Sequence, residues 1–305
     1  MTTRKRRLTV AVGLAATMLT SSAMAAAGQM SGWTVAVNAE SIAGTSSELN
    51  TPSNDGCPIE SPDGLHLYTA TNRPGGYGGI DIWAASRPTE DSAFGAPVNL
   101  GPVINSAADD FCPTPIPGGR LFFVSSRAVA GACGGADIYL AQRNPKHGWS
   151  TPANLGCQVN GPLGEAGPSY VEADGTAWLY FSSGPDIYVS ERQADGTFGL
   201  RTPIDELNTS AADLRPNVRK DGLEIVFDSD RAGTLGLADL WISSRSSTSV
   251  PWSAPVNAGP TVNSAVNETQ GSFSRDAFRL YFGRSPGPEG GSDIFVATRQ
   301  KVNGD

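Results

Sequence analysis

The sequence predicts an all-β fold, a five-bladed β-propeller built of four-stranded antiparallel blades. The first observation is a motif of Asp, an aliphatic residue and an aromatic residue, present in five copies. The copies begin at Asp81, Asp137, Asp186, Asp239 and Asp293, which are 56, 49, 53 and 54 positions apart. A period of about fifty residues made of short strands and turns is typical of propellers. The second observation is a content of 36 Gly and 22 Pro, with no sustained helical period beyond the N-terminus.

The second repeat shows the four strands that a blade requires. Residues 113–116 begin a first strand, and a Pro-Gly-Gly turn leads to a second strand over residues 120–126. Residues 137–143 form the third strand, and residues 149–154 lead to the fourth. The first turn contains Asp-Gly or Gly-Gly in four of the five repeats, as a two-residue hairpin with positive φ demands.

The fourth strand is also periodic, and its first copy comes one element early. Each copy begins with an aromatic residue: Trp33, Phe94, Trp149, Phe198 and Trp252. The chain ends just after the third strand of the fifth repeat. We therefore expect the segment from Trp33 to Asn38 to be the outer strand of the last blade. This strand closes the ring and leaves no free sheet edge.

The first 25 residues have the pattern of a secretory signal peptide. A basic stretch at residues 4–7 precedes an apolar stretch at residues 8–19, and Ala23-Met24-Ala25 is a small-residue cleavage site. After residue 25, no apolar run approaches the about 18 residues that cross a bilayer. We expect a secreted or periplasmic protein without membrane insertion, whose single propeller domain comprises residues 26–305.

Charge excludes one class of partner. The four basic residues of the signal peptide leave 18 of the 22 Lys and Arg against 30 Asp and Glu, a formal charge of about −12. Such an acidic surface excludes nucleic acid as a partner. A protein, peptide or carbohydrate ligand remains open.

The four Cys are an even set in an exported chain, which favours disulfides. Three pairings are possible. Cys57 and Cys112 have the same repeat position, each directly before a Pro, so we expect them to pair across neighbouring inner strands. Cys133 and Cys157 would then pair between two loops of the second blade. The alternative is a zinc site, but the chain has no Cys-x-x-Cys spacing and only two His.

The repeat resembles that of a known family. The stretches 110–113 (Asp-x-x-Pro), 121–127 (Leu-Phe-Phe-x-Ser-x-Arg) and 134–139 (Gly-Gly-x-Asp-Ile-Tyr) are similar to the WD-like repeat of TolB-type propellers in periplasmic and exported proteins. The resemblance covers about residues 33 to 299. It implies a propeller that binds other molecules, commonly without catalysis. The fifth copy departs from the pattern at residues 274–277.

One face of the ring is expected to collect an acidic residue from every repeat, three places before the repeat Pro. These residues are Asp55, Asp110, Glu165, Asp213 and Glu268, with Gly271 in place of the Pro in the fifth repeat. Five carboxylates around one axis repel each other unless each has a partner, a proton or a shared cation.

An Arg at the end of the second strand separates these acids into two groups. Arg73, Arg127 and Arg231 occur in the three repeats whose acid is Asp, and Pro stands there in the two repeats whose acid is Glu. We therefore expect the Asp members to be structural ion pairs. Glu165 and Glu268 would lack this partner and be free to bind a ligand.

Three further residues are predicted to bind the ligand. Arg215 and Gln270 stand just before the repeat Pro position, where they would be hydrogen-bond donors at the channel mouth. Tyr77 lies in a Gly-rich loop, where its ring could stack on a sugar or peptide side chain. The alternative for Tyr77 is ordinary packing on the next blade. The short loop of residues 183–186 would leave a notch in the rim beside Glu165.

Two functions fit these observations. The first is a noncatalytic binding propeller that engages a protein, peptide or glycan at its acidic upper face. The alternative is a propeller glycoside hydrolase, because glycoside hydrolysis needs two positioned carboxylates. Glu165 and Glu268 are then the candidate catalytic pair, with Asp110 or Asp109 as helper. No cofactor or metal ligand is predicted, and calcium is the cation expected if a carboxylate pair binds one.

Overall fold

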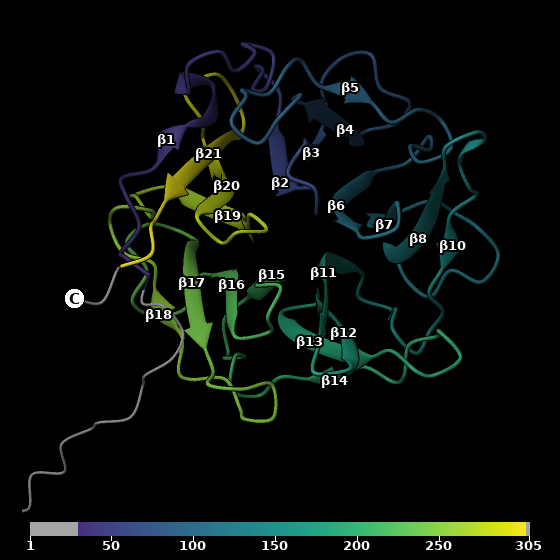
Figure 1. Ribbon diagram of the computed structural model, residues 1–305. Helices are drawn as coiled ribbons and strands as arrows, with labels where there is room; N and C mark the ends of the chain where they lie inside the picture. Colours follow the sequence, from purple (N-terminus) through teal and green to yellow (C-terminus); the bar gives the residue numbers. More distant parts are fainter. Residues whose placement is uncertain (1–29, 303–305) are drawn as a thin grey trace, which may run out of the picture.

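The computed structural model describes residues 30–302 as five blades arranged in a ring around one axis (Figure 1). Each blade is an antiparallel sheet, so the predicted fold is confirmed. The inner strands are β2 (Asp55–Glu60), β6 (Asp110–Ile116), β11 (Glu165–Ala173), β15 (Asp213–Val218) and β19 (Asn267–Phe273). We call the face at which these strands begin the upper face, and the face at which they end the lower face. The predicted signal peptide lies outside the described residues.

The second and third strands follow the repeat in every blade. The second strands are β3 (His66–Thr71), β7 (Arg120–Ser125), β12 (Thr176–Ser183), β16 (Glu224–Ser229) and β20 (Arg279–Ser285). The third strands are β4 (Asp81–Ser86), β8 (Asp137–Asn144), β13 (Asp186–Glu191), β17 (Asp239–Ser244) and β21 (Asp293–Thr298).

The outer strands have only two residues each. They are β5 (Val98–Asn99), β10 (Ala153–Asn154), β14 (Thr202–Pro203), β18 (Val256–Asn257) and β1 (Val37–Asn38). A further short strand, β9 (Gly148–Trp149), pairs with the end of β8. Within residues 30–302 the only helical element is the 3-10 turn η1 (Ala39–Ser41). No helix in this part of the chain is long and apolar enough to cross a membrane.

The last blade contains both ends of the described chain, as predicted. β1 pairs with β21, so that Val37 lies opposite Val296 and Asn38 opposite Phe295. The N–H of Thr34 also donates to the Thr298 carbonyl at 2.8 Å. Figure 1 shows this N-terminal strand beside the yellow C-terminal strands. The ring is therefore closed by backbone hydrogen bonds between distant parts of the sequence.

The core lies between the faces of neighbouring blades. One position near the start of each second strand is fully buried and aliphatic: Leu67, Leu121, Leu179, Ile225 and Leu280. Aromatic rings join adjacent blades, for example Phe122 of the second blade with Tyr170 and Phe198 of the third, at centroid distances of 5.6 and 5.9 Å. Such pairs stabilise the fold by roughly 0.5–1.5 kcal/mol beyond their buried area.

Both predicted disulfides are present. Cys57–Cys112 joins the first two inner strands, with 4.9 Å between the Cα atoms, and Cys133–Cys157 joins two loops of the second blade, with 5.5 Å. The four Cys therefore hold no metal. Disulfides of this kind are typical of proteins from an oxidising compartment.

We predict that deletion of residues 30–45 causes aggregation, because it removes β1 and exposes the edge of β21. Size-exclusion chromatography and melting curves measure the effect. Replacing Val37 by Thr, which keeps the backbone pairing, is the control and should stay monomeric. A deletion variant that is monomeric and as stable as the parent would contradict the prediction.

We predict that Cys57→Ser together with Cys112→Ser lowers the free energy of unfolding by roughly 2–4 kcal/mol. The disulfide restricts the unfolded chain over a sequence separation of 55 residues, and restriction of this kind is the main source of disulfide stability. Urea unfolding of the double variant measures the loss. An unchanged midpoint and slope would show that the bridge contributes nothing.

Candidate functional site

Every inner strand is interrupted by a β-bulge just below the upper face. The pairing of the inner strand with the second strand shifts register after the second or third residue of the inner strand. One residue in each bulge has positive φ: Cys57 (47°), Cys112 (46°), Gly167 (57°), Arg215 (49°) and Gln270 (60°). A bulge redirects the side chain of its extra residue. Four of these residues are not Gly, and left-handed backbone in such residues collects at functional sites.

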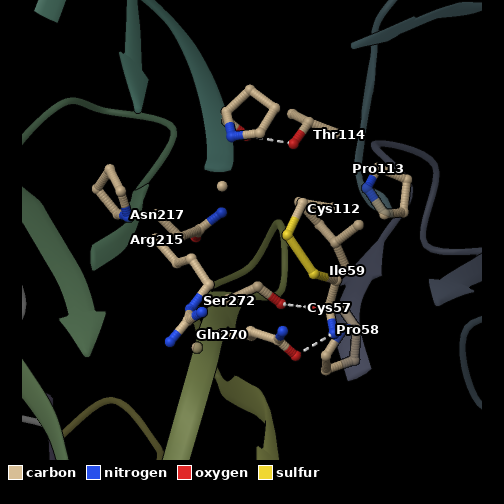
Figure 2. Close-up of a pocket in the computed structure, with 14 residues that line it drawn as sticks. Cys57, Pro58, Ile59, Cys112, Pro113, Thr114, Arg215, Asn217, Gln270 and Ser272 are labelled. Atoms are coloured by element: carbon tan, nitrogen blue, oxygen red, sulfur yellow. Dashed lines mark hydrogen bonds between the residues drawn. A yellow bond between two sulfur atoms is a disulfide. The ribbon is translucent and has the colours of Figure 1, made fainter. Parts of the chain in front are cut away.

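The bulge side chains line a small cavity between the inner strands (Figure 2). The Cys57–Cys112 disulfide spans one side, and the Gln270 Oε1 accepts the Cys57 N–H at 2.5 Å. Arg215 donates twice to Asp228, at 2.9 and 2.5 Å. These groups leave a cavity of only about 30 Å³ between them, room for about one or two waters. Arg215 and Gln270 thus line the same cavity, where Arg215 Nε and Nη2 and Gln270 Oε1 have protein partners. Their role in binding a ligand stays a prediction.

The five upper-face acids are also brought to equivalent places, and all are buried. Each accepts a backbone N–H from four residues earlier. Each is also paired with an Arg whose guanidinium donates to a carbonyl of the connection from the preceding blade. We call this unit of acid, Arg and carbonyl the blade clamp. The Arg pairs of Asp55 and Asp110 have N–O distances of 2.6 Å each, and Asp213 pairs with Arg231.

The prediction that Glu165 and Glu268 lack an Arg is wrong. Arg201, from the segment before β14, reaches Glu165 at 3.0 Å, and Arg284 of β20 reaches Glu268 at 2.7 Å. Each Arg arrives from a different position than in the Asp repeats, so the repeat alignment does not reveal it. In both of these repeats the acid is Glu, whose side chain is longer than that of Asp, and the Arg approaches it from a different direction.

Glu165 nevertheless differs from the other clamp acids. Its Oε1 accepts from Gly161 N–H, Ser183 and Arg201, whereas its Oε2 is buried without a hydrogen-bond partner within residues 30–302. Burial raises the pKa of this carboxyl from 4.5 to about 7, against the opposing effect of its hydrogen bonds and Arg201. A buried carboxyl with a pKa near neutrality is the property of a general acid.

The remaining predicted residues lie apart from this clamp. Tyr77 is 51 % exposed in the loop between β3 and β4, and its N–H donates to Asp81. Asp109 accepts the Ile80 N–H at 3.0 Å. Within residues 30–302, neither Tyr77 nor Asp109 forms a hydrogen bond or an ion pair with Glu165. The binding role of Tyr77 stays a prediction.

Asp228 is the channel residue that the sequence reasoning missed. It is buried, and it accepts from both Arg215 and the N–H of Gln270. A signal was present, because the equivalent position in the other repeats is Ala70, Val124, Ser182 or Gly283. An acid that occurs in one repeat and faces an Arg in the same repeat is the pattern to search for.

Residues 30–302 contain no group of three His, Cys, Asp or Glu side chains arranged to hold a metal ion. Calcium at the carboxylate pair stays a prediction.

No family model matches this chain, and no curated protein matches it. The TolB-type resemblance is therefore supported only in the propeller fold that it implied.

Solved structures do match. A xylan beta-1,4-xylosidase from Bacillus halodurans C-125 aligns at 19 % identity over 84 % of this chain and 54 % of its own, with a TM-score of 0.54. An alpha-L-arabinofuranosidase from Lactobacillus brevis aligns at 12 % identity over 85 % and 94 %, with a TM-score of 0.51. A GH43 endo-arabinanase from Bacillus licheniformis aligns at 15 % identity over 86 % and 97 %, with a TM-score of 0.50. The chain spans about half the length of the xylosidase.

Identities this low show a shared fold and no more. The comparison nevertheless contradicts the predicted noncatalytic binding propeller, because these structural neighbours are glycoside hydrolases.

We predict that the free energy of unfolding falls as the pH rises from about 4.5 to about 7. The folded Glu165 carboxyl keeps a proton that the unfolded chain loses above its pKa of 4.5. This stabilisation is complete below the unfolded pKa and is lost as the pH passes the folded pKa of about 7. We expect a loss of about 1–2 kcal/mol after screening by solvent.

Urea unfolding at intervals from pH 4 to pH 8 measures this profile. Glu165→Gln should flatten the profile relative to the parent protein. Parallel profiles for the two proteins would show that Glu165 does not carry the proton.

Proposed function

We propose that the protein is a glycoside hydrolase in which Glu165 is the general acid. The observation that carries the proposal is the buried Glu165 carboxyl, with its pKa raised to about 7 and its Oε2 unpartnered. Such a group is about half protonated near pH 7, and its protonated form can donate to a leaving oxygen. The fold shared with glycoside hydrolases supports the same chemistry.

The proposed reaction breaks the bond between an anomeric carbon and the glycosidic oxygen. Glu165 gives its proton to that oxygen, which leaves as an alcohol, and a second carboxylate attacks the anomeric carbon or activates a water. Asp110 in the adjacent blade and Glu268 in the fifth are the candidates for this second carboxylate. Both are held by an Arg, at 2.6 and 2.7 Å, so both are fixed in position.

Substrate reaches Glu165 only if the rim above it opens. Glu165 is buried, and its carboxyl accepts a hydrogen bond from the N–H of Gly161, at the start of the segment of residues 161–164. Leu163 in this segment is 72 % exposed, and its side chain lies over Gly184 of the short rim loop. We infer that this segment moves when a glycan binds.

The proposed setting is outside the cytoplasm, in keeping with the two disulfides. The substrates named for the neighbouring enzymes, xylan and arabinan, are the first ones to test.

Turnover of xylan, arabinan and aryl glycosides by the purified protein tests this proposal. Glu165→Gln should lower kcat by roughly 10²–10⁴-fold, with a melting temperature close to that of the parent at pH 7. The rate of the parent should decline as the pH rises above about 7, because the acid loses its proton.

Asp110→Asn and Glu268→Gln identify the second carboxylate by the same assay. Loss of its charge should remove activity, and melting curves separate this effect from the cost of an unpaired Arg. Full activity of Glu165→Gln would overturn the assignment, and no turnover on the whole panel would overturn the function.

A further inference from the structure

Each repeat has an Arg at the end of its third strand, and three of these occupy the same setting on the lower side of a blade. Nε of Arg87, Arg245 and Arg299 donates to a carbonyl of the first turn, at 2.7, 2.7 and 2.8 Å. Each guanidinium lies over the aromatic ring that begins the outer strand, at 4.3, 4.1 and 4.2 Å from the centroid. The three guanidinium groups are therefore held in the same way.

Two of the three have a carboxylate partner. Glu60, at the end of β2, binds Arg87 at 3.3 Å. Glu224, at the start of β16 in the preceding blade, binds Arg299 at 2.7 Å. The repeat thus offers two positions from which an acid can neutralise this Arg.

Arg245 has neither acid. Val218 occupies the position of Glu60, opposite Ile225 as Glu60 is opposite Leu67. Trp178 occupies the position of Glu224. It pairs with the residue before Arg192, just as Glu224 pairs with the residue before Arg245. Arg245 forms no ion pair within residues 30–302, where its side chain donates only to Gly222 and to the Tyr180 hydroxyl at 3.2 Å. Three of its five N–H donors have no partner there.

A cavity of about 250 Å³ lies at this Arg, in the groove between the third and fourth blades. Three aromatic residues form its walls, Trp178, Tyr180 and Trp252. The exposed Glu206 and the half-buried Thr248 add polar atoms, and Glu206 Oε1 accepts the Trp252 N–H at 3.2 Å. The equivalent groove of the first blade also has a cavity, but there Glu60 already neutralises Arg87.

The chemistry of this cavity selects a ligand with one carboxylate and several hydroxyl groups. A planar guanidinium binds a carboxylate through two parallel hydrogen bonds, and an aromatic wall covers the apolar face of a ring. The Glu206 carboxylate accepts hydroxyl donors and repels a second anionic group. The volume suits one sugar ring.

We propose that this cavity is a carbohydrate-binding site for a uronic acid residue of a glycan, with the sugar carboxylate on Arg245 and the ring against Trp178. The ligand carboxylate takes the place that Glu60 and Glu224 fill in the other grooves. The site opens on the lower side, whereas Glu165 lies at the upper face, and the proposal does not depend on hydrolysis.

Isothermal titration calorimetry with digalacturonic acid tests the proposal on the full protein. We expect binding that is at least tenfold weaker for Arg245→Gln and for Trp178→Ala, and unchanged for Glu165→Gln. Arg143→Gln is the matched control, because Arg143 holds the same repeat position in the second blade but is exposed. This control should bind like the parent.

Val218→Glu supplies the acid that the groove lacks, by analogy with Glu60, and should abolish binding while melting curves show a folded protein. If this variant does not fold, Arg245→Gln decides the question, because its half-buried side chain lies at the groove surface.

Cellobiose, a neutral disaccharide, tests whether binding requires a carboxylate on the sugar. Succinate and a peptide with a free C-terminus test whether binding requires the sugar ring. Equal affinity for any of these three, no binding of digalacturonic acid, or undiminished binding by Arg245→Gln would overturn the proposal.

Discussion

The blade clamp is the interaction on which the rest of the structure depends. In every blade a buried acid at the start of the inner strand holds an Arg, and that Arg holds a carbonyl of the preceding connection. The residues that supply these carbonyls, Leu49, Ile104, Val159, Leu207 and Val262, are fully buried. Removing one partner of a buried ion pair typically costs about 3–5 kcal/mol. The clamp therefore fixes each blade to the one before it.

The axis of the ring is narrow at the level of the bulges for a related reason. In four of the five blades the bulge below the clamp carries a side chain, from two Cys, an Arg and a Gln, and Gly167 occupies the fifth position. The disulfide and the Arg215–Asp228 pair leave almost no volume between them. A ligand is therefore expected at the two faces or in the grooves between blades. The repeat provides five such grooves of similar architecture and different side chains.

Functional candidates arise where a repeat position keeps its charge and loses a partner. Glu165 is the clamp acid of the third blade, but one of its carboxyl oxygens has no hydrogen-bond partner within residues 30–302, and burial raises its pKa. Arg245 is the cation of the groove between the third and fourth blades. Val218 and Trp178 stand where Glu60 and Glu224 neutralise Arg87 and Arg299 in the other grooves. Repetition therefore supplies an internal standard, because the other blades show what each residue would contact if its role were only structural.

The sequence by itself determined the blade count, the four strands per blade, the ring closure by Trp33 to Asn38 and both disulfides. These features follow from spacing, since equivalent positions of a repeat become equivalent places in a ring. Only the tertiary structure decided which Arg reaches Glu165 and Glu268, because a long side chain can approach a buried acid from strands that no alignment of repeats relates. Arg245 was likewise identified only from the structure. The two positions that could supply its acidic partner lie on different strands, β15 of its own blade and β12 of the neighbouring blade, and neither holds an acid.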